Sequence, residues 1–295
     1  MRTKLLVGVL ALMAAAGLSV LAAGGGKSLN KERQAMTLET PGTSRVLQLP
    51  AAAEHSKVIS LGTAIDPQSG LEVEGLAVIN PKPQKAKPDG VGGGDKKPKP
   101  PRDEVSSCWA PLAKGAVWKE VEPWQLDPTN AAGLDEAYLL DRMAGDIDKW
   151  EDATDGAMDD AAAADVLGLP SLVRGVTADS DSPDGKNEVL FGSIDEPGVI
   201  AVTIVWGVFG GPPKSRQLVE WDMVFNQDDF AWSTDGAAGT MDFENISTHE
   251  LGHSFGLGHP DDTCIEETMY AYADYGETKK RDLNAGDIAG ANELY

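Results

Sequence analysis

The sequence predicts an α+β fold, a class in which helices and a β-sheet come from separate parts of the chain. Residues 134–154 carry apolar side chains at spacings of three and four, which is typical of an amphipathic helix. Later segments rich in β-branched and aromatic residues are predicted to be strands: 187–192, 199–206 and 218–226. Asp242 offers an N-cap for a helix that contains several histidines, and a final helix is expected at 285–294.

The chain begins with positive charge followed by an apolar stretch. Residues 5–23 contain no charged side chain. This pattern predicts a signal peptide at 1–23, with cleavage near Ala22 or Ala23. Because the apolar run is long for a signal peptide, an uncleaved membrane anchor is the alternative. Either way the protein is expected to be secreted or held at the cell surface, and to meet a membrane only through such an anchor.

Residues 24–80 are predicted to be an N-terminal pro-segment or stalk. The part from 24 to 48 is polar and aperiodic, so little fixed structure is expected there. Strand-like runs at 57–61 and 71–79 predict a small hairpin. Residues 81–103 mix proline, lysine and glycine and are predicted to be a linker, either a spacer or a segment that is cut during activation.

The main domain is expected at 104–295, and this part of the chain is strongly acidic. It contains 11 basic and 38 acidic residues, against 14 and 9 in the residues before it. Such a charge argues against nucleic acid as a partner and favours a soluble, self-repelling surface. The protein is expected to be a monomer. A chain of 295 residues is long enough for one full catalytic domain and a smaller part.

Three of the four histidines fall within eleven residues. On a helix, His249 and His253 are four residues apart and leave the same face, so both imidazoles can reach one metal ion. His259 lies too far along for that face, but Gly256 lets the chain turn and return it as a third nitrogen ligand. Three protein ligands leave a fourth position for water, as in catalytic zinc sites.

Glu250 lies beside the same helix face. Its carboxylate can contact the metal-bound water without ligating the metal, so it is predicted to be the general base. Zinc is the expected metal, although affinity order alone does not select it over other divalent ions.

His249-Glu-Leu-Gly-His-Ser-Phe-Gly-Leu-Gly-His259 is a full HExxHxxGxxH motif and resembles the metzincin metalloproteases. Glu267-Thr-Met-Tyr supplies Met269 where that family has a methionine turn, and the chain from Arg281 onward looks like the closing helix of matrixins. Trp221-Asp-Met-Val-Phe-Asn looks like secreted matrixin-like enzymes of microbes.

The resemblance covers about 104–295. It implies a metzincin-type catalytic domain with a twisted mixed β-sheet, an active-site helix and a C-terminal helix, preceded by a poorly ordered N-terminal segment. In that family the edge strand of the sheet pairs with an extended peptide, and residues 199–206 take the corresponding place in the order. The alternative for 199–206 is a buried core strand.

Some features depart from animal matrixins. No further histidine lies within 104–295 for their second, structural zinc, so that site is expected to be absent. Their Pro-Arg-Cys-Gly motif is also missing, which puts a thiol switch in doubt. No further domain is expected after Tyr295. The two cysteines, Cys108 and Cys264, favour a disulfide in an exported protein, with two free thiols and zinc inhibition by Cys108 as alternatives.

Residues 179–188 concentrate oxygen donors around Gly185. The acidic spacing misses the EF-hand pattern by one residue, so a solvated turn and a calcium loop both remain open.

The predicted function is that of a secreted zinc-dependent endopeptidase that acts on a protein or peptide substrate. One rival is the same chemistry on a special substrate such as a cell-wall peptide. Another, from a different class, is an exported binding or surface module that retains the metal site without turnover.

Overall fold

The computed structural model describes residues 32–40, 45–53, 56–83, 107–156, 158 and 163–295. Residues 32–295 belong to one unit of the structure. The expected signal peptide or anchor lies outside the described residues, as does most of the expected linker. In the ranges that are described, no helix is both long enough and apolar enough to cross a membrane.

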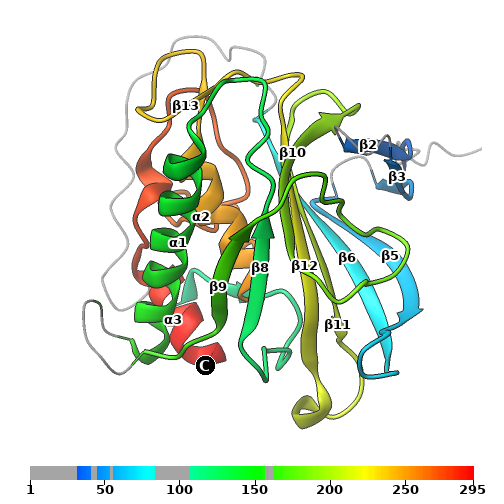
Figure 1. Cartoon of the computed structure of the whole chain (residues 1–295). Helices are drawn as coiled ribbons and strands as arrows, with labels where there is room; N and C mark the ends of the chain where they lie inside the picture. The colour runs from blue at the N-terminus through cyan, green and yellow to red at the C-terminus, as the bar shows by residue number, and fades with distance from the viewer. Residues whose placement is uncertain (1–31, 41–44, 54–55, 84–106, 157, 159–162) are drawn as a thin grey trace, which may run out of the picture. The chain divides into compact units, whose positions relative to one another are not determined.

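A mixed β-sheet forms the centre of the structure (Figure 1). Its order is β3-β2-β10-β12-β11-β6-β5, with β8 also paired to β10 and β9 paired to β8. The β10–β12 pair is parallel, whereas β11 is antiparallel to both β12 and β6. The strands span β2 Met36–Thr40, β3 Arg45–Leu49, β5 Val58–Ile65, β6 Glu72–Pro81, β8 Glu122–Leu126, β9 Leu167–Leu172, β10 Glu188–Ile194, β11 Val199–Val208 and β12 Gln217–Asn226.

Three α-helices lie on one side of this sheet (Figure 1). They are α1 Glu136–Asp152, α2 Phe243–Ser254 and α3 Ala285–Leu294. Each has a polar side chain at its N-terminus, for example Asp242, whose carboxylate accepts from the Asn245 backbone N–H at 2.9 Å before α2. The α+β class and the mixed sheet predicted from the sequence are therefore confirmed.

The described residues also form three 3-10 helices, at Ala153–Asp155, Pro213–Ser215 and Lys279–Arg281, and six strands of two residues each. Among these strands, β1 Glu32–Arg33 pairs with β4 Ala52–Ala53, β7 Ala110–Pro111 with β15 Leu257–Gly258, and β13 Trp232–Ser233 with β14 Met241–Asp242.

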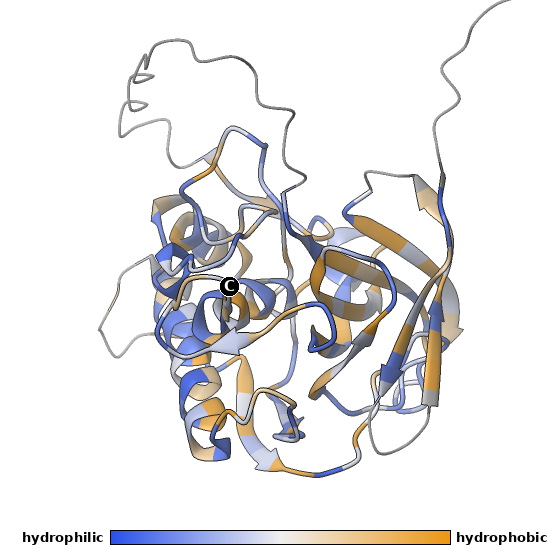
Figure 2. Ribbon diagram, turned by 90° about the horizontal axis from the view of Figure 1, so that it is seen from above, coloured by the Kyte–Doolittle hydropathy of each residue, from blue (hydrophilic) through white to orange (hydrophobic). Residues whose placement is uncertain are grey.

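Apolar side chains pack on both faces of the sheet, and the strands carry orange, apolar stretches (Figure 2). On the helix side, Trp150 of α1 is fully buried and its indole N–H donates to the Thr248 carbonyl of α2 at 2.8 Å. Trp206 of β11 is fully buried in the cluster on the opposite face. Because β11 is buried on both faces, its sequence is a continuous apolar run rather than an alternating one.

The N-terminal segment differs from the expectation. Little fixed structure was expected at 24–48, and this is wrong for β2 and β3, which pair with each other and extend the sheet through β10. The buried side chains of Met36, Leu38 and Thr40 alternate with less buried ones, as in a β-strand. This alternation covers only five residues, so it cannot be recognised within a polar stretch of sequence. The predicted hairpin is confirmed as β5–β6, and β6 continues into the main sheet by pairing with β11.

Of the two alternatives for 199–206, the structure shows the core strand. β11 lies between β12 and β6, so it has no free edge. The Cys108–Cys264 disulfide is confirmed, with the two Cα atoms 5.6 Å apart, and neither thiol is available to a metal.

Candidate metal centre

Local sequence explains how three histidines converge. Helix α2 carries His249 and His253 on adjacent turns and ends at Ser254. Gly256 then adopts φ 93°, a left-handed conformation that favours glycine, and the chain reverses. The following strand β15 pairs antiparallel with β7, which fixes the direction in which His259 returns.

The three imidazoles surround one point. Their ring centroids are 4.9 Å apart for His249 and His253, 4.7 Å for His253 and His259, and 5.3 Å for His249 and His259. One nitrogen from each ring can be chosen so that all three lie within 4.8 Å of one another. The structure thus brings together all three predicted ligands.

Hydrogen bonds on the outer side of two rings set which nitrogen faces that point. His249 Nδ1 lies 2.6 Å from the Thr268 carbonyl and His253 Nδ1 lies 2.8 Å from the Leu257 carbonyl. A ring that donates from Nδ1 keeps Nε2 as a free acceptor, which is the usual support of a histidine ligand. His253 Nε2 is buried and has no hydrogen-bond partner, so this donor set fits a metal ion.

Burial also keeps the imidazoles neutral. It lowers the pKa of His253 to about 4 and the pKa values of His249 and His259 well below the usual 6.5. Neighbouring positive charge on Lys280 lowers them further. Neutral imidazole is the form that ligates a metal.

Glu250 is fully buried at the same site. One of its carboxylate oxygens accepts from the Thr203 hydroxyl on β11 at 2.5 Å. The Asn80 amide on β6 faces the same carboxylate without completing a hydrogen bond. Desolvation raises the pKa of Glu250 to about 7, while Thr203 and Asn80 act in the opposite direction.

Met269 lies beneath α2, with 1% of its surface exposed. A Cβ added to Gly252 would be 2.2 Å from the Met269 sulfur, so the missing side chain of Gly252 makes room for it. The Asp287 carboxylate on α3 accepts from the backbone N–H groups of Thr268 at 2.7 Å and Met269 at 3.0 Å. Met269 therefore packs under the site in a turn that α3 holds.

Sequence reasoning missed Lys280, which is fully buried with its Nζ 3.3 Å from His249 Nδ1. Lys280 donates to the Tyr270 carbonyl, and burial lowers its pKa to about 7. No motif marks it, because Lys279, Lys280 and Arg281 form an ordinary basic run in the sequence. Thr203 and Asn80 were missed for a related reason: only strand pairing brings them to α2.

The acidic loop lies elsewhere in the structure. Its oxygen donors from Asp179, Asp184 and Glu188 come within 4.8 Å of one another, and β12 adds Glu220 and Asp222 beside Asp179. Desolvation raises the pKa of Glu188 to about 7 and that of Glu220 to about 8. Calcium binding by this loop stays a prediction.

Comparisons with known proteins agree with the geometry of the histidine site. Residues 212–295 match the matrixin (peptidase M10) family. The chain is 38% identical to the matrilysin of Rattus norvegicus over 74 residues, which is 25% of this chain and 26% of that protein. It is 31% identical to the matrilysin of Felis catus over 130 residues, or 44% of this chain and 42% of that protein.

A plant protein is also similar: the metalloendoproteinase 1-MMP of Arabidopsis thaliana is 41% identical over 56 residues, which is 19% of this chain and 14% of that protein. The chain thus spans less than half the length of each of these relatives. Together these likenesses support a metalloprotease.

Proposed function

We propose that this chain, a matrixin-like metzincin, is a secreted zinc-dependent endopeptidase that acts on protein or peptide substrates. The observation that carries the proposal is the convergence of three neutral imidazoles, of which those of His249 and His253 are buried and that of His259 is partly exposed, beside a buried carboxylate. His249, His253 and His259 would hold the ion through ring nitrogens. Glu250 comes from the same helix as His249 and His253 and is not one of these ligands.

When bound, zinc would supply an open coordination position that acidifies a water molecule and polarises the scissile carbonyl. Glu250 accepts the proton of the attacking water on a carboxylate oxygen and passes it to the departing amine. The Thr203 hydroxyl orients that carboxylate from β11. The Thr268 and Leu257 carbonyls hold the rings of His249 and His253 in the ligating orientation.

The test is metal analysis joined to a proteolysis assay on denatured protein substrates, with the chain measured both intact and after limited trypsin cleavage of residues 84–103. We expect zinc to copurify and activity to disappear with a chelator and return with zinc. Glu250→Gln should keep the metal and lose activity by a factor of about 100 or more, the usual worth of a general base. The matched control is Glu266→Gln, an exposed carboxylate outside the site, which should behave as the wild type.

Two results would reject this function. Hydrolysis retained by Glu250→Gln would remove the assigned base. Metal bound by the wild type, with no cleavage of any varied substrate before or after limited trypsin cleavage of residues 84–103, would favour the exported binding module.

Export is a separate part of the proposal. It is supported by the apolar N-terminal sequence and by the Cys108–Cys264 disulfide, which is typical of oxidising compartments. N-terminal sequencing of the mature protein checks it: a start near Ala23 supports a cleaved signal, and a start at Met1 supports an anchor.

A further inference from the structure

The edge of β11 that faces away from β12 is filled by the chain's own N-terminal segment. β6 pairs antiparallel with β11 over nearly its whole length, from Gly207 opposite Glu74 to Val199 opposite Pro81, with one irregularity near Val199. β11 is the strand that carries Thr203, the hydrogen-bond partner of Glu250. A peptide that adds to this sheet beside the catalytic carboxylate must use the same backbone groups of β11 that β6 now occupies.

The catalytic carboxylate beside this edge of β11 is also covered. Glu250 has 0% of its surface exposed, and so have His249 and His253. Asn80, near the end of β6, is itself fully buried and faces the Glu250 carboxylate. A peptide carbonyl cannot contact a carboxylate that has no exposed surface, so Glu250 is covered in this form of the chain, although His259 keeps partial exposure.

Side chains just before β5 and just after β6 also contact residues 262–275, the loop region that follows His259 and includes Met269. Lys57 forms an ion pair with Asp262, and its ammonium lies 4.5 Å from the centre of the Tyr272 ring. Lys82 lies 3.5 Å from the centre of the Tyr275 ring and 3.3 Å from Asp274.

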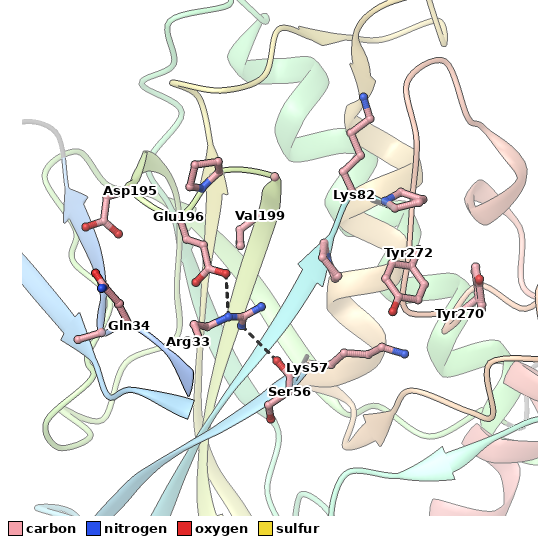
Figure 3. A pocket seen from close by; sticks show the side chains of 15 residues that line it. Arg33, Gln34, Ser56, Lys57, Lys82, Asp195, Glu196, Val199, Tyr270 and Tyr272 are labelled. Atoms are coloured by element: carbon pink, nitrogen blue, oxygen red, sulfur yellow. Dashed lines mark hydrogen bonds and ion pairs between the residues drawn. The ribbon is translucent and has the colours of Figure 1, made fainter. Parts of the chain in front are cut away.

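Between the hairpin and this loop is a cavity of about 940 Å³, into which Lys57 and Tyr272 project (Figure 3). On its other side, Arg33 of β1 pairs with Glu196 beside β11 and donates to the Ser56 carbonyl at 3.1 Å. The N-terminal segment therefore contacts the catalytic part at Glu196 as well as at Asp262 and residues 272–275.

We propose that β6 is an intramolecular occupant of the substrate-binding edge of β11, and that the β5–β6 hairpin must leave this edge before the enzyme can bind a peptide. The proposal rests on the proposed endopeptidase function. In this proposal the chain is inactive while β6 pairs with β11. A cysteine that ligates the metal is not involved, because Cys108 is bonded to Cys264.

Tethering explains why a free peptide does not displace β6. A segment linked to its own binding site has an effective concentration in the millimolar range, so a free peptide of the same intrinsic affinity must reach about millimolar concentration to compete with it. Residues 84–103, rich in lysine and proline, join β6 to the catalytic part. A cut there would remove the link on that side and let the hairpin dissociate.

A cross-strand disulfide tests whether β6 must move. Ala77 and Ile204 are register partners on β6 and β11, and both belong to the apolar cluster on the sheet face opposite α2. Paired residues of antiparallel strands have Cα atoms about 4.5–5.5 Å apart, within the range of a disulfide. The double variant Ala77→Cys/Ile204→Cys can lock β6 in place without touching the metal site, and each single variant is its matched control.

The assay uses the full zinc-loaded chain, a fluorogenic peptide and a peptide hydroxamate that binds zinc in metalloprotease sites. Each protein is measured intact and after limited trypsin cleavage of the linker, with the cut and the new disulfide verified by mass spectrometry. Each is measured with and without TCEP. The wild type under TCEP corrects for reduction of Cys108–Cys264.

We expect trypsin to raise the rate of the wild type and of both single variants. The oxidised double variant should stay latent after the cut and gain activity under TCEP. If β6 leaves the edge of β11 in less than about 1% of the oxidised double-variant molecules, their rate of peptide cleavage should be lower than that of the single variants by a factor of about 100.

The variant Gly75→Val tests the opposite change. A Cβ at Gly75 would lie 2.7 Å from the buried Trp206 ring, so this variant should loosen β6 and cleave peptide without a cut in the linker.

The outcomes separate the two proposals. If the oxidised double variant cleaves peptide as fast as the single variants, or binds the hydroxamate equally well, β6 does not cover the site and the inference is wrong. If no form cleaves any peptide but the hydroxamate binds only unlocked forms, the endopeptidase function is wrong and the strand cover stands.

Discussion

Gly252, between the first two histidines, offers a sharp test of how the metal helix packs. In an exposed helix, replacing glycine with alanine stabilises by about 1 kcal/mol, because glycine loses more backbone entropy on folding. At Gly252 the new Cβ would lie 2.2 Å from the Met269 sulfur and 2.8 Å from a ring carbon of Trp150. Both neighbours are at most 1% exposed, so neither has free space to move into.

Overpacking of a filled core typically costs about 1–3 kcal/mol, which offsets or exceeds the gain in helix propensity. We therefore expect Gly252→Ala to lower the free energy of unfolding by up to about 2 kcal/mol. The matched control is Gly145→Ala in α1, where the added Cβ meets no atom within 4 Å. That variant should raise the free energy of unfolding by about 1 kcal/mol.

Urea unfolding of the zinc-loaded proteins measures both variants. A double-mutant cycle with Met269→Ala identifies the contact, because removing the methionine side chain should recover about 0.5–3 kcal/mol of the loss at Gly252. If Gly252→Ala is instead as stabilising as Gly145→Ala, Met269 does not pack against α2 as described.

Four further predictions concern Asp287, the Cys108–Cys264 disulfide, zinc binding and the buried carboxylate of Glu220. Asp287→Asn replaces one of the carboxylate oxygens that accept from the backbone N–H groups of Thr268 and Met269. We expect it to lower the free energy of unfolding in urea by about 1–3 kcal/mol and to weaken zinc retention in a chelator competition. Unchanged values would contradict the role of α3 in holding this turn. Replacing Cys108 and Cys264 with alanine opens a link across 156 residues and should cost about 2–5 kcal/mol, measured as a lower urea midpoint; an unchanged midpoint would mean that the bridge adds nothing. Zinc at about 100 times its Kd should stabilise the apo protein by about 2.7 kcal/mol, and no rise in Tm would deny a site formed only in the folded chain. Burial raises the pKa of Glu220 from 4.5 to about 8, so between these values the folded state holds a proton that the unfolded state releases. With chelator present, the free energy of unfolding should therefore fall as pH rises from about 5 to about 8. The same dependence of the unfolding free energy on pH in Glu220→Gln would refute this.

The sequence predicted those parts of the site whose geometry is local. The spacing of His249 and His253 follows from the helix repeat, and the turn at Gly256 follows from the conformations open to glycine. These two relations predict that the three imidazoles can meet, and the pairing of β15 with β7 then sets the direction in which His259 returns. The helices and the strands β10, β11 and β12 were found for the same reason, because their side-chain periodicity is a property of the segment itself.

Residues that reach the site through strand pairing could not be predicted. Thr203 and Asn80 face Glu250 only because β11 and β6 pair in one particular register, and nothing in either segment specifies its partner. The buried carboxylates illustrate the same limit: Glu188 and Asp222 are register partners of the parallel β10 and β12, 34 positions apart in the chain. The position of Lys280 beside His249 could not be predicted either, because it depends on the path of the loop beneath α2.

The support of the third imidazole extends well outside the segment that matches the matrixin family. His259 follows β15, whose only described strand partner is β7 at Ala110–Pro111, and the loop after it is bonded to Cys108. A truncated protein that starts after residue 111 would keep every letter of the motif and lose both attachments. The boundary of the recognisable family sequence is therefore not the boundary of the smallest working unit, which has to include residues 108–111.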